Sequence, residues 1–213
     1  MADRIEDILW HYPSVYLTEH HLAHLLGGTP DSRYARLRRA TQKGLLVKVK
    51  RGLYYLGERL ATHPPHPFEL AQFIYGPSYI SLESALAYHN LIPEAVYAIT
   101  CASIKRTAQF MTPLAEFKYH RLPLENFLLG VRYIENDPYQ FFMASPWKAL
   151  LDYIYCYKKE WDSMTPLQES LRIELDDLPL ISSSELSKLT HYYHSQRITR
   201  FIKQIPQEFI HAP

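Results

Sequence analysis

Basic side chains gather in one short stretch of the chain, and a polyanion is the ligand that such a stretch would bind. Residues 31–51 hold eight Lys and Arg residues and a single acidic one, Asp31. The formal net charge of the whole chain is only +1, so the excess is local. Like charges at this density repel one another unless a polyanion compensates them. The pattern therefore favours a specific nucleic-acid-binding face over general stickiness.

The spacing of these residues suits one face of a helix. At about 100° per residue, Tyr34, Leu37 and Thr41 fall on one side, with Ala40 near them. The opposite side holds Ser32, Ala35, Arg36, Arg39 and Lys43, with Arg38 on the flank. We expect the first side to pack against preceding helices and the second to enter the major groove of DNA. A basic hairpin after this helix would contact phosphates and sugars.

The predicted DNA-binding residues are Ser32, Arg33, Arg36, Arg38, Arg39, Lys43, Lys48, Lys50, Arg51 and Tyr54. The alternative is an ordinary solvated helix face, but charges on such faces usually alternate in sign. The sequence contains no glycine-aromatic strand motif or zinc knuckle of the RNA-binding kind. Double-stranded DNA is thus the expected ligand.

Motifs for catalysis and metal binding are missing from the sequence. It has no Gly-x-Ser-x-Gly, no Gly-rich phosphate loop and no His-Glu-x-x-His. His20 and His24 lie four residues apart, as ligands on one helix face do, but no carboxylate or cysteine in motif spacing completes a site. We expect a protein that is not an enzyme and has no metal and no cofactor.

Local signals predict most of the elements that position these residues. Thr18 is the expected N-cap of a helix that stops at Gly27-Gly28, and Asp31 or Ser32 is the expected cap of the basic helix. Ser81 is likewise expected to cap the helix that follows it. The predicted helices are 3–11, 19–26, 31–42, 68–75, 82–90, 146–157, 166–175 and 182–205. The predicted strands are 45–50, 53–56, 78–81, 95–102, 115–121, 130–135 and 139–144.

These elements predict an α+β protein with two domains. The first, residues 1–58, has the order of a winged helix-turn-helix. A proline-rich linker at 59–67 breaks any regular element. The second, residues 68–213, is predicted to be a larger mixed α/β domain with a helical C-terminal tail.

Three segments together resemble the AbiEi antitoxin family of abortive-infection toxin–antitoxin systems. They are KGLLVKVKRGLY at 43–54, YISLESALAYHNLIPE at 79–94 and ASPWKALLD at 144–152. The first is shared by many winged helices, whereas the second and third together are fairly specific. Their order and spacing agree with the family over about residues 5–157.

The resemblance implies a repressor that binds inverted repeats in its own operon. It further implies a C-terminal domain that counteracts a nucleotidyltransferase-like toxin without forming a stable complex, the arrangement called type IV. Exposed residues on or beside the matched segments are the candidates for this activity. They are Glu83, His89, Lys105, Arg106, Lys148 and Asp152. The alternative is a stand-alone winged-helix transcription factor whose second domain senses a ligand or partner.

The sequence also predicts where the protein works. No apolar run approaches the roughly 18 residues that a membrane-spanning helix needs, so we expect no membrane partner. The first residues carry charges of both signs and lack the apolar stretch of a signal peptide. A cytoplasmic location is the expectation.

Overall fold

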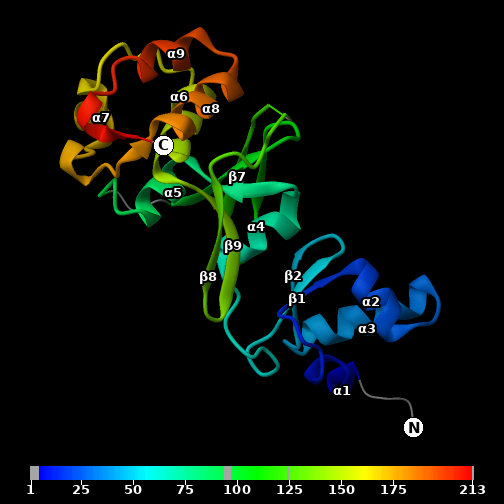
Figure 1. Ribbon diagram of the computed structural model, residues 1–213. Coiled ribbons are helices and arrows are strands. Elements are labelled where there is room, and N and C mark those ends of the chain that lie inside the picture. The colour runs from blue at the N-terminus through cyan, green and yellow to red at the C-terminus, as the bar shows by residue number, and fades with distance from the viewer. Residues whose placement is uncertain (1–4, 94–96, 124, 213) are drawn as a thin grey trace.

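Two sheets of different size organise the chain, and helices cover them. The computed structural model describes residues 5–93, 97–123 and 125–212 (Figure 1). The fold is mixed α+β, as the sequence predicts. The smaller sheet is built from the first 56 residues, and the larger one from residues 78–144.

The N-terminal elements follow the predicted order, with one addition. They are α1 (Ile5–Trp10), β1 (Tyr16–Thr18), α2 (Glu19–Leu26), α3 (Pro30–Gln42), β2 (Leu46–Lys50) and β3 (Leu53–Leu56). The short strand β1 was not expected from the sequence. It pairs antiparallel with β3, so the sheet has the order β1-β3-β2.

Side-chain caps explain where the two longer helices of this part begin. The Thr18 hydroxyl accepts a hydrogen bond from the backbone N–H of His21, which confirms the predicted N-cap of α2. Helix α3 starts at Pro30, one residue before the predicted range. Its cap is Thr29, whose hydroxyl accepts from the N–H of Ser32, and not Asp31 or Ser32. Pro30 follows the cap, where its fixed φ favours the first helical turn.

The larger sheet combines two hairpins with parallel strands. Its strands are β4 (Ser78–Ile80), β5 (Ala98–Ser103), β6 (Ala108–Met111), β7 (Glu116–Arg121), β8 (Val131–Asn136) and β9 (Tyr139–Ala144), in the order β6-β7-β5-β4-β9-β8. Strand β5 runs parallel to β7, and β4 runs parallel to β9. Strand β6 was not expected. Of the residues predicted to begin β5, 95 and 96 lie outside the described residues.

Helices cover both faces of this sheet. The Thr100 side chain of β5 bonds to α5 (Leu82–Tyr88), where it accepts from the N–H of Ser84 at 2.9 Å. Tyr119 of β7, which pairs with Cys101, donates instead to the Ala71 carbonyl of α4 (Pro67–Tyr75) at 2.7 Å. Neighbouring strand residues point to opposite faces. Helices α4 and α5 therefore lie on opposite sides of the sheet, and α6 (Pro146–Cys156) packs beside α5.

The C-terminal tail is helical, as predicted, but more broken than expected. It contains α7 (Thr165–Leu171), η1 (Leu175–Asp177), β10 (Ile181–Ser182), α8 (Ser183–Tyr193), α9 (Gln196–Ile202), η2 (Gln207–Phe209) and β11 (Ile210–His211). A single helix over 182–205 was predicted. His194 ends α8 in the left-handed conformation, with φ at 45°, and so separates it from α9.

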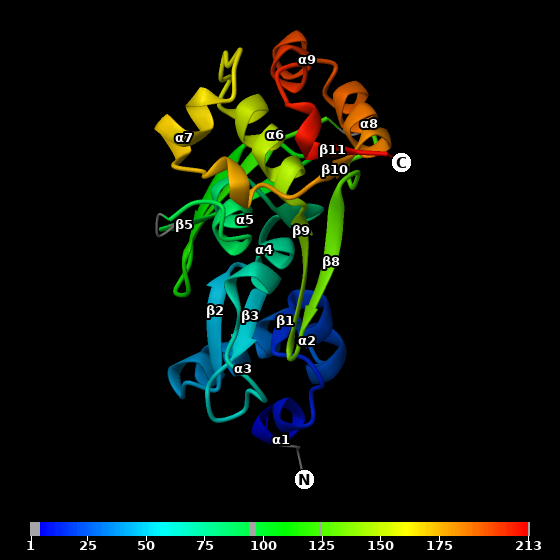
Figure 2. The same ribbon diagram turned by 60° about the vertical axis from the view of Figure 1, so that its left-hand side comes forward.

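One face of the smaller sheet packs on α4 (Figure 2). Val15, Tyr16, Val49 and Leu53 belong to the same buried cluster as Leu70 and Ile74 of α4. The ring of Tyr16 stacks on Phe73 with centroids 5.1 Å apart. The apolar core of the C-terminal part thus continues into the N-terminal part. No helix or strand lies between Leu56 and Pro67, where the linker was predicted.

A buried carboxylate completes this joint. Glu69 of α4 accepts from the Tyr16 hydroxyl at 3.1 Å through Oε2 and from the Gln140 N–H at 2.8 Å through Oε1. Tyr16 in turn accepts from the His66 N–H at 2.7 Å. The Tyr16 phenol therefore connects strand β1 with the start of α4, and the Glu69 carboxylate connects α4 with β9.

We predict that Tyr16→Phe lowers the free energy of unfolding by about 1–3 kcal/mol, because it leaves a buried carboxylate oxygen and a backbone N–H without a partner. Urea unfolding followed by circular dichroism measures this. Tyr34→Phe is the matched control, since Tyr34 is 68% exposed. Its effect should stay within about 0.5 kcal/mol. Equal effects of the two substitutions would contradict this assignment.

Candidate nucleic-acid interface and buried polar centre

Helix α3 turns a different face inward from the one predicted. Ala40 is fully buried, and Leu37 is half-buried, as expected. Tyr34 and Thr41 were expected to pack beside them, but both are exposed, so that part of the prediction is wrong. The inward face instead includes Arg36, together with Arg33 one turn earlier.

Hydrogen bonds explain why two arginines face inward. Arg36 donates through Nη1 to the Leu26 carbonyl at 2.8 Å, and Arg33 donates to the Gly28 carbonyl at 2.5 Å. Carbonyls at the C-terminal end of a helix have no partner within that helix. The two guanidinium groups satisfy such carbonyls at the end of α2 and its turn, and so fix α3 against α2.

The remaining cations of α3 are available to a ligand. Arg38, Arg39, Lys43 and the neutral Ser32 are exposed. Within the ranges that the structure describes, none of these three cations forms an ion pair with a carboxylate. Arg39 and Lys43 border a hollow of about 910 Å³ between α1 and α3. The exposed face of α3 itself is lined by Tyr34, Ala35 and Arg38.

The hairpin β2–β3 extends this surface. Lys48, Arg51 and Tyr54 line a hollow of about 440 Å³ between α3 and the hairpin, together with Arg33 and Tyr34. Lys48 and Arg51 are exposed. The hairpin turns at Gly52, with φ at 75°, and its carbonyl accepts from the Glu19 N–H at 2.7 Å. This φ lies in the left-handed region, so the turn favours glycine, and a Cβ here would also lie 3.3 Å from the Glu19 Cβ.

Lys50 differs from the other hairpin cations. Its ammonium donates to the Ile74 carbonyl at the end of α4 and lies 5.4 Å from the centre of the Phe110 ring. Burial lowers the pKa of Lys50, and the charge of Lys105 lowers it further. The expectation that Lys50 faces DNA phosphates is contradicted by this geometry, because the side chain holds the two parts of the chain together.

The six candidates of the C-terminal part separate into four places. Lys105 and Arg106 are exposed after β5, and the Lys105 ammonium lies 5.0 Å from the Tyr75 ring centre. His89 is half-buried and donates to the Ala144 carbonyl at 2.9 Å. Glu83 lies beside Tyr157, at the other end of α5. The packing of α5 on α6 does not bring Glu83 and His89 to Lys148 and Asp152.

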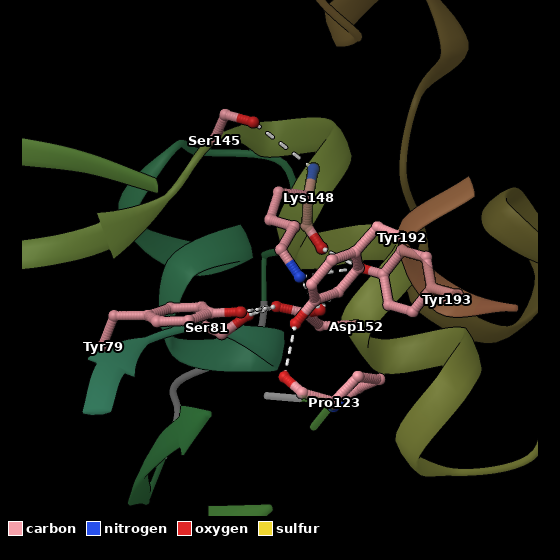
Figure 3. A network of polar contacts seen from close by, with 8 residues as sticks. All are labelled: Tyr79, Ser81, Pro123, Ser145, Lys148, Asp152, Tyr192 and Tyr193. Atoms are coloured by element: carbon pink, nitrogen blue, oxygen red, sulfur yellow. Dashed lines mark hydrogen bonds and ion pairs between the residues drawn. The ribbon is translucent and has the colours of Figure 1, made fainter. Parts of the chain in front are cut away.

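Lys148 and Asp152 are both fully buried, so the prediction that they are exposed is wrong. They lie four residues apart on α6, and the Lys148 Nζ is 2.5 Å from the Asp152 Oδ1 (Figure 3). Such a spacing places two side chains on one helix face. On an exposed helix it would form a surface pair, but here α6 is covered on this side by α5 and α8.

Hydroxyl groups from two other elements complete the network around Asp152. Its Oδ1 accepts from the Tyr193 hydroxyl at 2.6 Å, and its Oδ2 accepts from Ser81 at 2.6 Å and Tyr79 at 3.0 Å. Ser81 was predicted to cap α5, but it makes no capping bond and donates to Asp152 instead. The network therefore joins β4, α6 and α8.

Aromatic rings surround the Lys148 ammonium. It lies 4.1 Å from the Tyr192 ring centre and 4.7 Å from that of Tyr193, and it donates to the Tyr193 hydroxyl at 3.0 Å. Burial lowers the pKa of Lys148, and the Asp152 charge opposes this shift. Burial and then the Asp152 charge raise the pKa of Tyr79 and Tyr193, so both phenols stay protonated as donors.

Tyr79, Ser81, Tyr192 and Tyr193 were not predicted as site residues. The first two lie in the segment at 79–94 and the ion pair in the segment at 144–152, so these two segments meet at one network. A lysine and an aspartate four residues apart on an otherwise apolar helix were the available signal. No such signal marked Tyr192 and Tyr193, because both lie beyond residues 5–157, over which the family resemblance extends.

The centre is closed in a way that suits a structural role. Every polar side chain in it has a partner inside the protein, and no carboxylate or hydroxyl is left facing solvent. Over residues 5–93, 97–123 and 125–212, no group of three or more His, Cys, Asp and Glu side chains could hold a metal ion. Among the helices in these ranges, none is long and apolar enough to cross a membrane.

Comparison with known proteins adds no identification. No protein-family model matches the sequence, and no curated protein matches it.

We predict that Asp152→Leu lowers the free energy of unfolding by about 3–5 kcal/mol, because it leaves the Lys148 ammonium buried without a counter-charge. The double variant Lys148→Met with Asp152→Leu should recover part of this loss, because no unpaired charge remains. Glu6→Gln is the control. It removes an exposed ion pair with Arg59 and should cost at most about 1 kcal/mol. A double variant less stable than Asp152→Leu would contradict the prediction.

Proposed function

We propose that the chain is a DNA-binding repressor and that α3 is its recognition helix. The order α1-β1-α2-α3-β2-β3, with the sheet order β1-β3-β2, supports a winged helix-turn-helix in which β2–β3 is the wing. The observation that carries the proposal is that exposed cations border the hollows on both sides of α3 and, in the part of the chain that the structure describes, form no ion pair with a carboxylate.

We assign roles to the predicted DNA residues, and to the neighbouring Tyr34 and Ala35, from their positions on α3 and the hairpin. Tyr34, Ala35 and Arg38 lie on the exposed face of α3, which is the face that would meet base edges. The groups at the sides of this face, suited to phosphates, are Ser32, Arg39, Lys43, Lys48 and Arg51. Arg33 and Arg36 position α3 against α2. Inverted repeats as the target follow from the family resemblance, and two copies would occupy them.

For the C-terminal part we propose the antitoxin activity of the AbiEi family, directed at a nucleotidyltransferase-like toxin. Tyr79 and Ser81 of one matched segment bond to Asp152 of another. This contact supports the resemblance, because it gives two separate segments a common structural role. Contacts with a toxin would then fall to exposed residues, of which Lys105 and Arg106 are the foremost. A gene for such a toxin next to this one would support the proposal.

DNA binding is tested by fluorescence anisotropy with the DNA upstream of the gene. We predict that Arg38→Ala weakens binding by about 1–3 kcal/mol and relaxes sequence preference, because an arginine on the outer face can pair with a guanine edge. Lys48→Ala should weaken all sequences alike and reduce the slope of log affinity against log salt by about one.

Lys50→Met is the matched control for Lys48→Ala, because it removes a cation that faces α4. It should lower stability and leave the salt slope unchanged. The proposal fails if a folded triple variant, Arg38→Ala with Arg39→Ala and Lys43→Ala, binds the upstream DNA as tightly as the unaltered protein.

Antitoxin activity is tested by growth rescue, with the adjacent toxin gene expressed from a second promoter. We predict that Lys105→Ala with Arg106→Ala reduces rescue while DNA affinity stays the same, since both side chains are exposed after β5, outside α3 and the hairpin. Stability should fall by at most about 1 kcal/mol, because Lys105 loses its contact with the Tyr75 ring. Arg38→Ala should do the reverse. A stable stoichiometric complex of the two proteins on a sizing column would contradict the expected type IV mechanism.

A further inference from the structure

A pocket of about 890 Å³ lies between α8 and the turn at residues 125–129. Its apolar lining includes Ile104, Phe127, Leu129 and Tyr192, and Leu128 borders it with 55% of its surface exposed. Small-molecule sites typically enclose about 300–1,000 Å³ and combine apolar walls with a few polar groups. The volume and lining of this pocket fall within that description.

The apolar wall of the pocket is held in place from behind. The Tyr192 ring contacts the buried Lys148 ammonium, and its hydroxyl donates to the Pro123 carbonyl at 3.3 Å. The Phe127 ring packs on Tyr79, with centroids 4.9 Å apart. Both aromatic groups are thus fixed by the network of Lys148 and Asp152. A wall that is already ordered reduces the entropy that a ligand would lose on binding.

Charge at the rim favours an anion. Helix α8 contributes Lys188, His191 and His194, and the opposite rim contributes a single acid, Glu125. A neighbouring hollow that shares Ile104 carries Arg121. Another hollow that shares both histidines carries Lys203 and Arg200, the latter 3.5 Å from Glu160. With the histidines neutral, the rim itself holds one cation, Lys188, and one acid, Glu125, and the excess of positive charge comes from Arg121 and Lys203 in the neighbouring hollows. The histidines add N–H donors, and the summed potential attracts negative charge.

We propose that this pocket binds a small amphipathic anion. Its apolar body would lie against Phe127, Leu129 and Tyr192, and its carboxylate, sulfonate or phosphate would face Lys188 and His191. This proposal is independent of the DNA-binding function. The site belongs to the C-terminal part, at the opposite end of the molecule from α3 (Figure 2).

The probe is 1-anilinonaphthalene-8-sulfonate, which has an aromatic body and one sulfonate, titrated into the intact protein and followed by fluorescence. We expect saturable binding at one site. Lys188→Glu should weaken it about tenfold, because it reverses a charge beside the sulfonate. Leu128→Gln should weaken it about threefold or more, because it removes apolar surface from the border.

The matched controls are Lys158→Glu and Leu180→Gln. Each changes the same residue type at an exposed position away from the pocket, and Leu180 is 61% exposed. Neither should alter the affinity. Urea unfolding of each variant checks that the fold is intact, since partly unfolded chains also bind this dye.

Three results would overturn the proposal. The first is binding that is unsaturable or unchanged by both pocket substitutions in folded variants. The second is equal affinity for the uncharged dye Nile red at this site, which would exclude recognition of an anion. The third is a change in molecular mass of the protein with Leu128→Gln in sedimentation, which would assign the pocket to contact between copies of the chain.

Discussion

The buried ion pair of Lys148 and Asp152 needs further hydrogen bonds, and the C-terminal part supplies all of them only when it is fully folded. Removing two charges from water is costly, and their attraction offsets that cost only with good geometry and further hydrogen bonds. Those bonds come from Tyr79 and Ser81 beside β4 and from Tyr193 at the end of α8. A state that lacks α8 leaves the pair incompletely satisfied. The pair therefore favours cooperative folding of sheet, helix and tail over any partial arrangement.

Local interactions explain which elements could be predicted from the sequence. The helices around Leu22 and Leu150 and the hairpin at Arg51-Gly52 depend on periodicity, caps and turns, and all are present. Strands β1 and β6 span only three and four residues and exist because a partner strand is in place. No local sequence pattern predicts such pairing.

The site shows the same division between local and distant causes. A cationic surface on α3 could be predicted from the sequence, but the presence of Arg33 and Arg36 on the inward face of the helix could not. The orientation of α3 about its own axis depends on the hydrogen bonds that Arg33 and Arg36 donate to carbonyls at the end of α2. A prediction from helical periodicity treats arginine as a polar residue and places it on the outer face. Lys148 and Asp152 are likewise charged but buried. Hydrogen bonds from Tyr193 and Ser81, which are distant in sequence, offset the cost of removing the Asp152 carboxylate from water.

The shared face of the small sheet affects how this protein can be divided. Val15, Tyr16, Val49 and Leu53 meet α4, and cutting the chain in the proline-rich segment before α4 would uncover apolar surface on both fragments. Exposed apolar patches of this kind promote aggregation. A fragment that ends after Tyr75 would carry α4 with it and keep this surface covered, along with the carbonyl to which Lys50 donates. Helix α4 also covers one face of the large sheet, where Tyr119 donates to the Ala71 carbonyl, so a cut on either side of α4 uncovers apolar surface and the two halves of the chain share this helix.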